Sequence, residues 1–195
     1  CPPTNGLTYQ PSNTLSFFDG KHSNGIWTLK VQDVANQDGG SLNTWGLKVC
    51  GTLGCQLSVT QTTGTNTGSL PAAISCAAAG DTIRLTSLLT GQTVNVGNVP
   101  IALTKNLVIV AEGTGTNITG SGTRVFEMSP GVQVQIWDVN ITAGTSMTGG
   151  AINNPGILTL KNVDIERNPG VSGASLITNS PGAQLFISGT VRINQ

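Results

Sequence analysis

Short apolar runs separated by turn-forming residues dominate the chain from about residue 55 onward. Gly131, Gly156 and Gly182 lie 25 and 26 residues apart, and two alternating apolar runs follow each of them. These runs occupy residues 132–136 with 139–141, 157–160 with 163–165, and 185–187 with 191–193, and an earlier coil contains 101–103, 107–110 and Ile118. One such unit cannot bury its own apolar positions, whereas stacked units form a continuous core. The pattern therefore predicts a solenoid.

The length of the repeat distinguishes this solenoid from an antiparallel sandwich. A sandwich would place hairpin turns at intervals of roughly 8–12 residues, instead of a repeat of about 25. Asn153, Asn154 and Asn179 lie near equivalent corners of successive repeats. Asn tolerates a left-handed backbone, and its amide can stack on an equivalent amide in the next coil. We expect an all-β protein with a short right-handed parallel β-helix over residues 53–195.

Residues 69–80 predict a small helix that covers the open N-terminal end of the β-helix, because a solenoid needs a cap. Ser69 suits the N-cap position, and Pro71 falls in the first helical turn. Alanines then favour helix, and Gly80 is expected to end it.

The four cysteines are Cys1, Cys50, Cys55 and Cys76. An even count favours disulfides and an oxidising compartment. We expect the pairs Cys1–Cys50 and Cys55–Cys76, although four cysteines allow three pairings. A zinc site is disfavoured because the chain has a single histidine, His22, and no CxxC pair.

The first 52 residues have a different pattern, with alternating strands predicted at 26–31 and 45–50 around a turn at 38–40. The segments Asn24-Gly25-Ile26-Trp27-Thr28-Leu29 and Gly39-Gly40-Ser41-Leu42-Asn43-Thr44-Trp45 resemble the closing part of the proprotein-convertase P domain. That domain is a β-sandwich that follows subtilisin-like catalytic domains. The resemblance implies part of an antiparallel β-sandwich over residues 1–52, and we expect the chain to be a fragment of a longer protein.

A second resemblance covers residues 55–195. The segments 68–70, 73–74 and 79–83 are similar to the "SLREAI" entry motif of a bacterial β-helix family, with Pro71 and Ala72 where Arg and Glu are usual. The segments 149–154 and 156–160 are similar to that family's "GGAIxNxGxLTL" coil. The resemblance implies a surface stalk or adhesin-like region.

Composition and charge narrow the set of partners. Charged residues make up 9% of the chain, against roughly 25% in typical globular proteins. Nine basic and nine acidic residues cancel, so nothing favours a nucleic acid or an anionic membrane surface as a partner. No apolar stretch approaches the roughly 20 residues that a membrane-spanning helix needs.

Several acidic residues are candidate catalytic or metal-binding groups. Asp138 and Asp164 are 26 residues apart, about one coil, so we expect them to stack on one face as the best catalytic or Ca²⁺-binding candidates. Solvent-exposed acids without a further role are the favoured alternative. Asp33 and Asp38 are weak Ca²⁺ candidates near turns, where plain turn capping is favoured. Without a GxSxG motif or a second histidine, we expect no catalytic residues and no cofactor other than Ca²⁺.

Two interaction surfaces follow from the same pattern. Trp137 alternates with Ile136 and is therefore expected to point outward, towards a protein partner or a glycan. Val191 and Ile193 form the last apolar run, and we expect this open end to bind secretion or surface machinery, or another copy of the chain.

The function expected from the sequence is non-catalytic. We expect the C-terminal region of a secreted or cell-surface bacterial protein, acting in surface display, attachment or recognition by export machinery. The two resemblances together imply a type IX secretion substrate of the Bacteroidota. The alternatives are an accessory region of a subtilisin-like serine protease and a carbohydrate-binding or lyase-type β-helix.

Overall fold

The structure, a computed structural model, describes residues 55–122, 124–144, 150–171 and 175–194, together with Thr28 and Lys30. The chain divides into two compact units, Cys1–Leu53 and Gly54–Gln195. In the first unit, the structure describes Thr28 and Lys30, and both are exposed. The strands predicted at 26–31 and 45–50 and the Cys1–Cys50 bridge otherwise lie outside the described residues.

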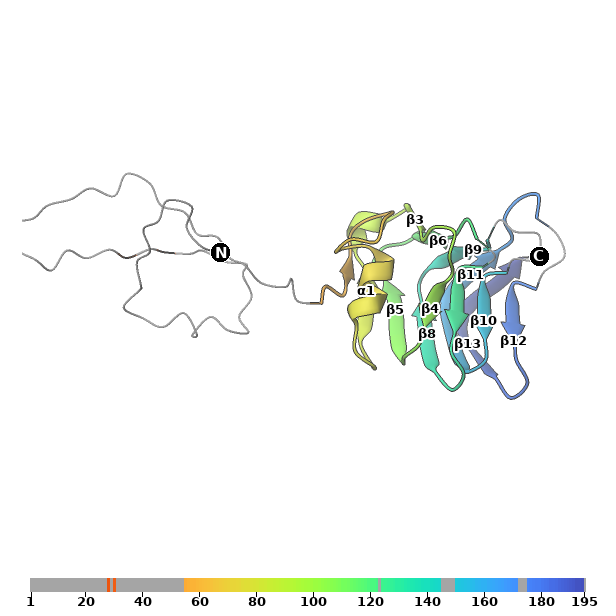
Figure 1. Ribbon diagram of the computed structural model, residues 1–195. Coiled ribbons are helices and arrows are strands. Elements are labelled where there is room, and N and C mark those ends of the chain that lie inside the picture. The colour runs from red at the N-terminus through yellow and green to blue at the C-terminus, as the bar shows by residue number, and fades with distance from the viewer. Residues whose placement is uncertain are drawn as a thin grey trace, which may run out of the picture. The chain divides into compact units, whose positions relative to one another are not determined.

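Parallel strands build the second unit as a β-solenoid of about five turns with three faces (Figure 1). The first face contains β1 (Ser58–Val59), β2 (Thr82–Leu85), β5 (Leu107–Ala111), β8 (Gln133–Trp137) and the first halves of β11 (Ile157–Glu166) and β13 (Gln184–Asn194). The second face contains β3 (Thr93–Asn95), β6 (Asn117–Thr119), β9 (Asn140–Thr142) and the second halves of β11 and β13. The third face contains β4 (Ile101–Leu103), β7 (Phe126–Met128), β10 (Ile152–Asn154) and β12 (Ile177–Asn179). The predicted parallel β-helix is confirmed.

Aliphatic side chains of successive coils stack on one another inside the solenoid. On the first face, Ile83, Ile109, Ile136 and Leu160 are register partners in consecutive coils, and all four are fully buried. Their separations in sequence are 26, 27 and 24 residues. Burying such a side chain is worth about 1.5–3 kcal/mol, so this ladder is a main source of stability.

The corner between the first and second faces differs from coil to coil. Two separate strands were expected at 157–160 and 163–165, but β11 runs through the corner without interruption. Asn162 makes this bend with a single left-handed residue of φ 52°, a conformation that Asn tolerates. In β13 the corner is one residue longer, since Lys161 pairs with Ser188 and Val163 pairs with Val191.

The predicted cap is helix α1 (Leu70–Cys76), at the β1 and β2 end of the solenoid (Figure 1). The Ser69 hydroxyl accepts a hydrogen bond from the amide of Ala72 at 3.3 Å, as expected for an N-cap. The helix buries Leu70, Ala73 and Ile74 against the core. No helix among the described residues is long and apolar enough to cross a membrane.

The end of α1 differs from the prediction. The helix stops at Cys76, with Ala77 as C-cap in an extended conformation, several residues before Gly80. The cause is tertiary, because the Lys105 ammonium donates to the carbonyl oxygens of Ser75 at 3.1 Å and Ala77 at 2.6 Å. A cation at a helix C-terminus compensates the carbonyls that have no partner within the helix.

The Cys55–Cys76 disulfide joins the last turn of α1 to the residues just before β1, as the sequence predicted. The bonded cysteines are 21 residues apart. Closing a loop of this length stabilises a protein by about 3 kcal/mol in the loop-entropy model.

Replacing both cysteines, in Cys55→Ser/Cys76→Ser, should therefore lower the free energy of unfolding by about 3 kcal/mol in urea denaturation followed by circular dichroism. A reductant should lower the stability of the wild type towards that of the variant and leave the variant unchanged. Equal stability of the variant and the oxidised wild type would show that the bridge does not hold the cap.

Candidate interaction surface

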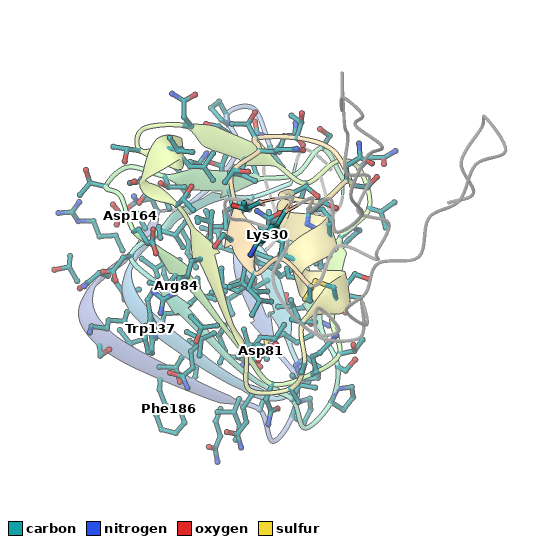
Figure 2. All side chains as sticks on the ribbon, turned by 90° about the vertical axis from the view of Figure 1, so that its left-hand side faces the viewer. Lys30, Asp81, Arg84, Trp137, Asp164 and Phe186 are labelled. Carbon is teal, nitrogen blue, oxygen red and sulfur yellow. A yellow bond between two sulfur atoms is a disulfide. The ribbon has the colours of Figure 1, made fainter. Side chains whose placement is uncertain are left out.

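Two columns of outward side chains line the first face of the solenoid. Side chains alternate along a strand, so the residues between the buried ladders point away from the core. We call the set the outer face, and its members are Arg84, Val108, Val110, Gln135, Trp137, Thr159, Lys161, Phe186 and Ser188. Figure 2, viewed along the solenoid, shows Arg84, Trp137 and Phe186 on one side of it.

Trp137 lies on the outer face and is half-buried, next to the fully buried Ile136 in β8. Its register partners are Val110 in the preceding coil and Lys161 in the next. The Lys161 ammonium lies 5.7 Å from the centre of the indole ring. A cation at this distance attracts the ring face with roughly 0.5–1 kcal/mol at an exposed site. The contact restrains the ring between neighbouring coils.

Phe186 gives the outer face a second aromatic group, and its side chain is 53% exposed. The sequence analysis grouped residues 185–187 as one apolar run and did not single Phe186 out. Its neighbours Leu185 and Ile187 point inward, and their register partners Leu158 and Leu160 are buried. Alternation along β13 places Phe186 outward. An exposed Phe and a half-buried Trp on one sheet face are typical of a surface that contacts a ligand or partner.

Polar groups surround these rings. Gln135 and Thr159 are half-buried neighbours in the column that ends at Phe186. Arg84 forms an exposed ion pair with Glu112, with 3.8 Å between the nitrogen and the oxygen. The outer face therefore offers ring surfaces, hydrogen-bonding groups and cations. This combination suits the binding of a flat, hydroxyl-rich or peptide ligand.

The expected stacking of Asp138 and Asp164 is wrong. The residue stacked on Asp138 in the next coil is 24 residues away instead of the expected 26, so it is Asn162. The Asn162 amide donates to the Asp138 carboxylate at 2.8 Å. Asp164 instead pairs in register with Asn140 and Arg192, and its carboxylate lies 3.5 Å from the Arg192 guanidinium. The two acids therefore occupy different columns and cannot act as a pair on one face.

Side chains that could bind a metal ion are dispersed over the described part of the chain. There, no three side chains of His, Cys, Asp and Glu come together as a metal site would require. The other Ca²⁺ candidates, Asp33 and Asp38, lie outside the described residues, as do Cys1 and Cys50.

Amides form the expected ladder at one corner of the solenoid. Asn154 is fully buried, and its amide nitrogen donates to the side-chain oxygen of Asn179 and to the carbonyl of Gln184, both at 2.9 Å. Its side-chain oxygen accepts from the amide of Gly156. The expected left-handed backbone occurs elsewhere, at Asp138 and Asn162 among the described residues other than glycine. The buried amide is held by its hydrogen bonds alone.

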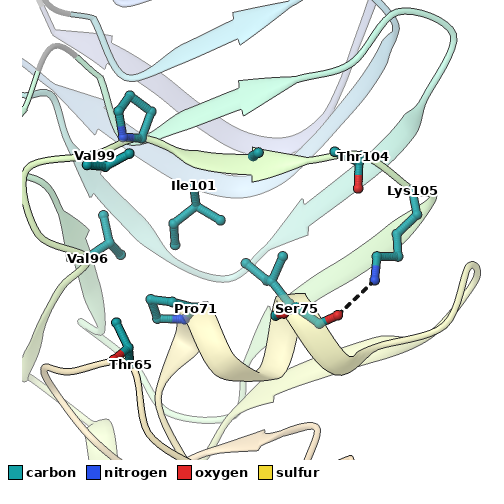
Figure 3. A pocket seen from close by; sticks show the side chains of 11 residues that line it. Thr65, Pro71, Ser75, Val96, Val99, Ile101, Thr104 and Lys105 are labelled. Atoms are coloured by element: carbon teal, nitrogen blue, oxygen red, sulfur yellow. Dashed lines mark hydrogen bonds between the residues drawn. The ribbon is translucent and has the colours of Figure 1, made fainter.

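A pocket of about 440 Å³ lies between α1 and β4 (Figure 3). Apolar side chains contribute much of its lining, including Pro71, Ile74 and Val99. Lys105 is the charged residue in the lining, and its ammonium already caps α1. The polar part of the lining also includes the hydroxyl groups of Thr65, Ser75 and Thr104.

Inward side chains of β13, the last strand among the described residues, are more exposed than their register partners in β11. Ile187 and Ile193 are 54% and 39% exposed, whereas their register partners Leu160 and Ile165 are fully buried. Val191 is half-buried. The positions that form the core in every earlier coil are thus partly uncovered in β13.

The first unit of the chain matches a known protein family. A family model described as the proprotein convertase P-domain matches residues 5–49. This match confirms the resemblance to the P domain over those residues. P domains are non-catalytic accessory domains of proteases. No curated protein matches the chain, and neither does any solved structure.

The corner residue Asn162 allows a direct stability test. An alanine at this position would adopt the left-handed backbone conformation at a cost of about 1–2 kcal/mol. The Asn162 side chain also donates to the Asp138 carboxylate and accepts from the backbone amide of Thr190. Asn162→Ala should lower the free energy of unfolding by at least this amount, and Asn162→Gly by less, because glycine adopts the conformation freely. Equal losses in urea denaturation would show that backbone conformation does not govern this corner.

Proposed function

We propose that this chain is a non-catalytic accessory region of an exported subtilisin-like protease. In this proposal the P-domain segment supports the catalytic domain and the β-solenoid attaches the protein to the cell surface or displays it there. The match of the P-domain family to residues 5–49 is the observation that carries the proposal, because that domain accompanies such proteases.

The solenoid supports an attachment role in two ways. Asp138 and Asp164, the candidate catalytic pair, contact different side chains. Asn162 donates a hydrogen bond to Asp138, and Arg192 forms an ion pair with Asp164. Parallel strands pair between consecutive coils of the first face, and its outer face is accessible at Phe186, which is 53% exposed. A spacer that holds a binding surface away from the rest of the protein needs stacked coils and an accessible face, and it needs no reactive group.

We place the protein outside the cytoplasm, as a secreted or surface protein of a bacterium. The Cys55–Cys76 disulfide supports an oxidising compartment. Membership of the solenoid in the SLREAI-type family, an origin in the Bacteroidota and recognition by type IX secretion machinery are parts of the same proposal. They rest on the motifs at residues 68–83 and 149–160. The open end at β13 is the proposed contact for a protein partner.

The proposal is tested on the gene that encodes the chain. We expect a catalytic domain with Ser, His and Asp of the subtilisin type to be encoded upstream of Cys1. Deleting residues 54–195 from the complete protein should leave peptide hydrolysis unchanged and release the protein from cells into the medium. A gene without a protease domain, or a truncated enzyme that remains bound to cells, would contradict the accessory and attachment roles respectively.

The outer face favours carbohydrate binding as a second candidate function. Trp137 and Phe186 provide ring surfaces, and Gln135, Thr159 and Lys161 lie between or beside them in the same two columns. A glycan recognised here would stack its sugar rings on the aromatic side chains and bond its hydroxyl groups to the polar ones.

On a glycan array, the full chain should therefore bind a defined subset of polysaccharides, and Trp137→Ala should lose that binding. Leu88→Ala provides the matched control, because Leu88 is 74% exposed and lies outside the outer face. Binding that survives Trp137→Ala, or a complete absence of binding, would exclude the outer face as a glycan site.

A further inference from the structure

Four outward side chains form a square in the middle of the outer face. Gln135 and Trp137 lie two residues apart in β8, and Thr159 and Lys161 lie two residues apart in β11. Gln135 pairs in register with Thr159, and Trp137 pairs with Lys161. Neighbouring strands are about 4.8 Å apart, and alternate residues along a strand are about 6.6 Å apart. We call these four residues the Lys161 cluster, and strands of further coils, β5 and β13, lie on its two sides.

Lys161 forms no ion pair with the described residues. Three other cations of the solenoid do so: Arg84 with Glu112, Arg124 with Glu127, and Arg192 with Asp164. Lys105 donates to the carbonyl oxygens at the end of α1. The Lys161 ammonium lies over the Trp137 ring instead, 5.7 Å from its centre. An aromatic ring attracts a cation without neutralising its charge, so Lys161 keeps a full positive charge at a restrained position.

The other members of the Lys161 cluster add hydrogen-bond donors. Within the described part of the chain, no group accepts from the Trp137 indole N–H, the Gln135 amide or the Thr159 hydroxyl, and none of these polar atoms is fully buried. An ammonium and an indole N–H only donate, whereas an amide and a hydroxyl both donate and accept. Donors therefore outnumber acceptors on this square, and one of them is charged.

From this excess of donors we propose that the Lys161 cluster binds the acidic sugars of a polysaccharide. This assignment rests on carbohydrate binding as the function of the outer face and specifies its ligand class. A carboxylate or sulfate group offers acceptor oxygens and the negative charge that Lys161 lacks as a partner. The hydroxyl groups of the same sugar can donate to and accept from Gln135 and Thr159.

Arg84 extends the positive charge along the same column. Arg84, Val110, Trp137 and Lys161 are register partners in consecutive coils, so Arg84 and Lys161 lie about 14 Å apart. The pair of Arg84 with Glu112 is exposed, and such pairs contribute little, so a ligand anion can replace Glu112. No acid belongs to the outer face. A linear acidic polysaccharide that follows the column thus reaches both cations.

The geometry favours a polysaccharide over an acidic peptide. β8 and β11 are already paired with strands on both sides, so an extended peptide cannot join them through its backbone. The nine basic and nine acidic residues of the chain cancel, so a polyanion gains no general attraction from net charge. Binding must therefore depend on particular residues, and single substitutions can test it.

Titration calorimetry of the full chain tests the ligand class. The probes are polygalacturonate and alginate, which carry carboxylates, and dextran sulfate, each compared with its carboxyl-reduced or unsulfated counterpart. We expect at least one acidic polymer to bind about tenfold more tightly than its neutral counterpart, since a hydrogen bond to a charged group contributes this much. The affinity should fall as salt is added. The polymers that bind show whether carboxylate, sulfate or both are recognised.

Two variants of equal charge locate the binding site. Lys161→Gln removes the charge and keeps an amide donor, and it should weaken binding of the acidic polymer about tenfold. Arg192→Gln is the matched control, because it removes one exposed cation from the second face, and it should bind as the wild type does. Urea denaturation of both variants separates a loss of binding from a loss of folding.

Four results would overturn the proposal. Equal affinity for acidic and neutral polymers, lost in Trp137→Ala, would leave carbohydrate binding in place without acidic specificity. Equal losses in Lys161→Gln and Arg192→Gln would show that binding follows overall charge. Polyglutamate that binds as tightly as the acidic polysaccharides would identify an acidic protein as the partner. An absence of binding to every polysaccharide would reject carbohydrate binding and the acidic ligand together.

Discussion

Stacking of aliphatic side chains between successive coils is the interaction on which the rest of this structure depends. A rung such as β8 contributes few inward residues, and those bury their surface only because β5 and β11 lie directly above and below. The parallel backbone pairing and the side-chain ladder therefore form together or not at all.

The cap at the first coil shows how such a stack is covered. Helix α1 places Leu70 and Ile74 over the core, and a disulfide and the Lys105 contact hold the helix. The helix thus buries apolar surface that no preceding coil covers among the described residues.

Local sequence signals predicted much of the fold because the coils depend on short-range alternation. The N-cap at Ser69, the runs around Ile136 and the pairing of Cys55 with Cys76 could all be inferred from neighbouring residues and the repeat. The C-terminal end of α1 could not, because it depends on Lys105, which follows Ala77 by 28 residues.

The candidate site residues were harder to place, since their positions depend on the length of each coil. Corners gain or lose residues, so a spacing of 26 suggested that Asp138 and Asp164 stack. The true partner of Asp138 is 24 residues away, at Asn162. The same short coil brings Lys161 over Trp137. Both contacts therefore depend on the number of residues in each corner.

Surface chemistry follows from the same stacking. Because inward positions are reserved for the core, the outward positions of consecutive coils form straight columns, and a few side chains define each surface. Trp137, Lys161 and Phe186 belong to such columns on the first face. Neighbouring coils rather than loops thus position the candidate ligand-binding groups, on a rigid support.

The dependence of the fold on the aliphatic ladder is tested most directly by removing one step from it. Ile136 is fully buried between Ile109 and Leu160, so Ile136→Ala should lower the free energy of unfolding by about 2–5 kcal/mol in urea denaturation. Leu88→Ala, at a 74% exposed position, should change it by less than about 0.5 kcal/mol. Similar small effects at both positions would contradict the conclusion that stacking between coils holds the solenoid together.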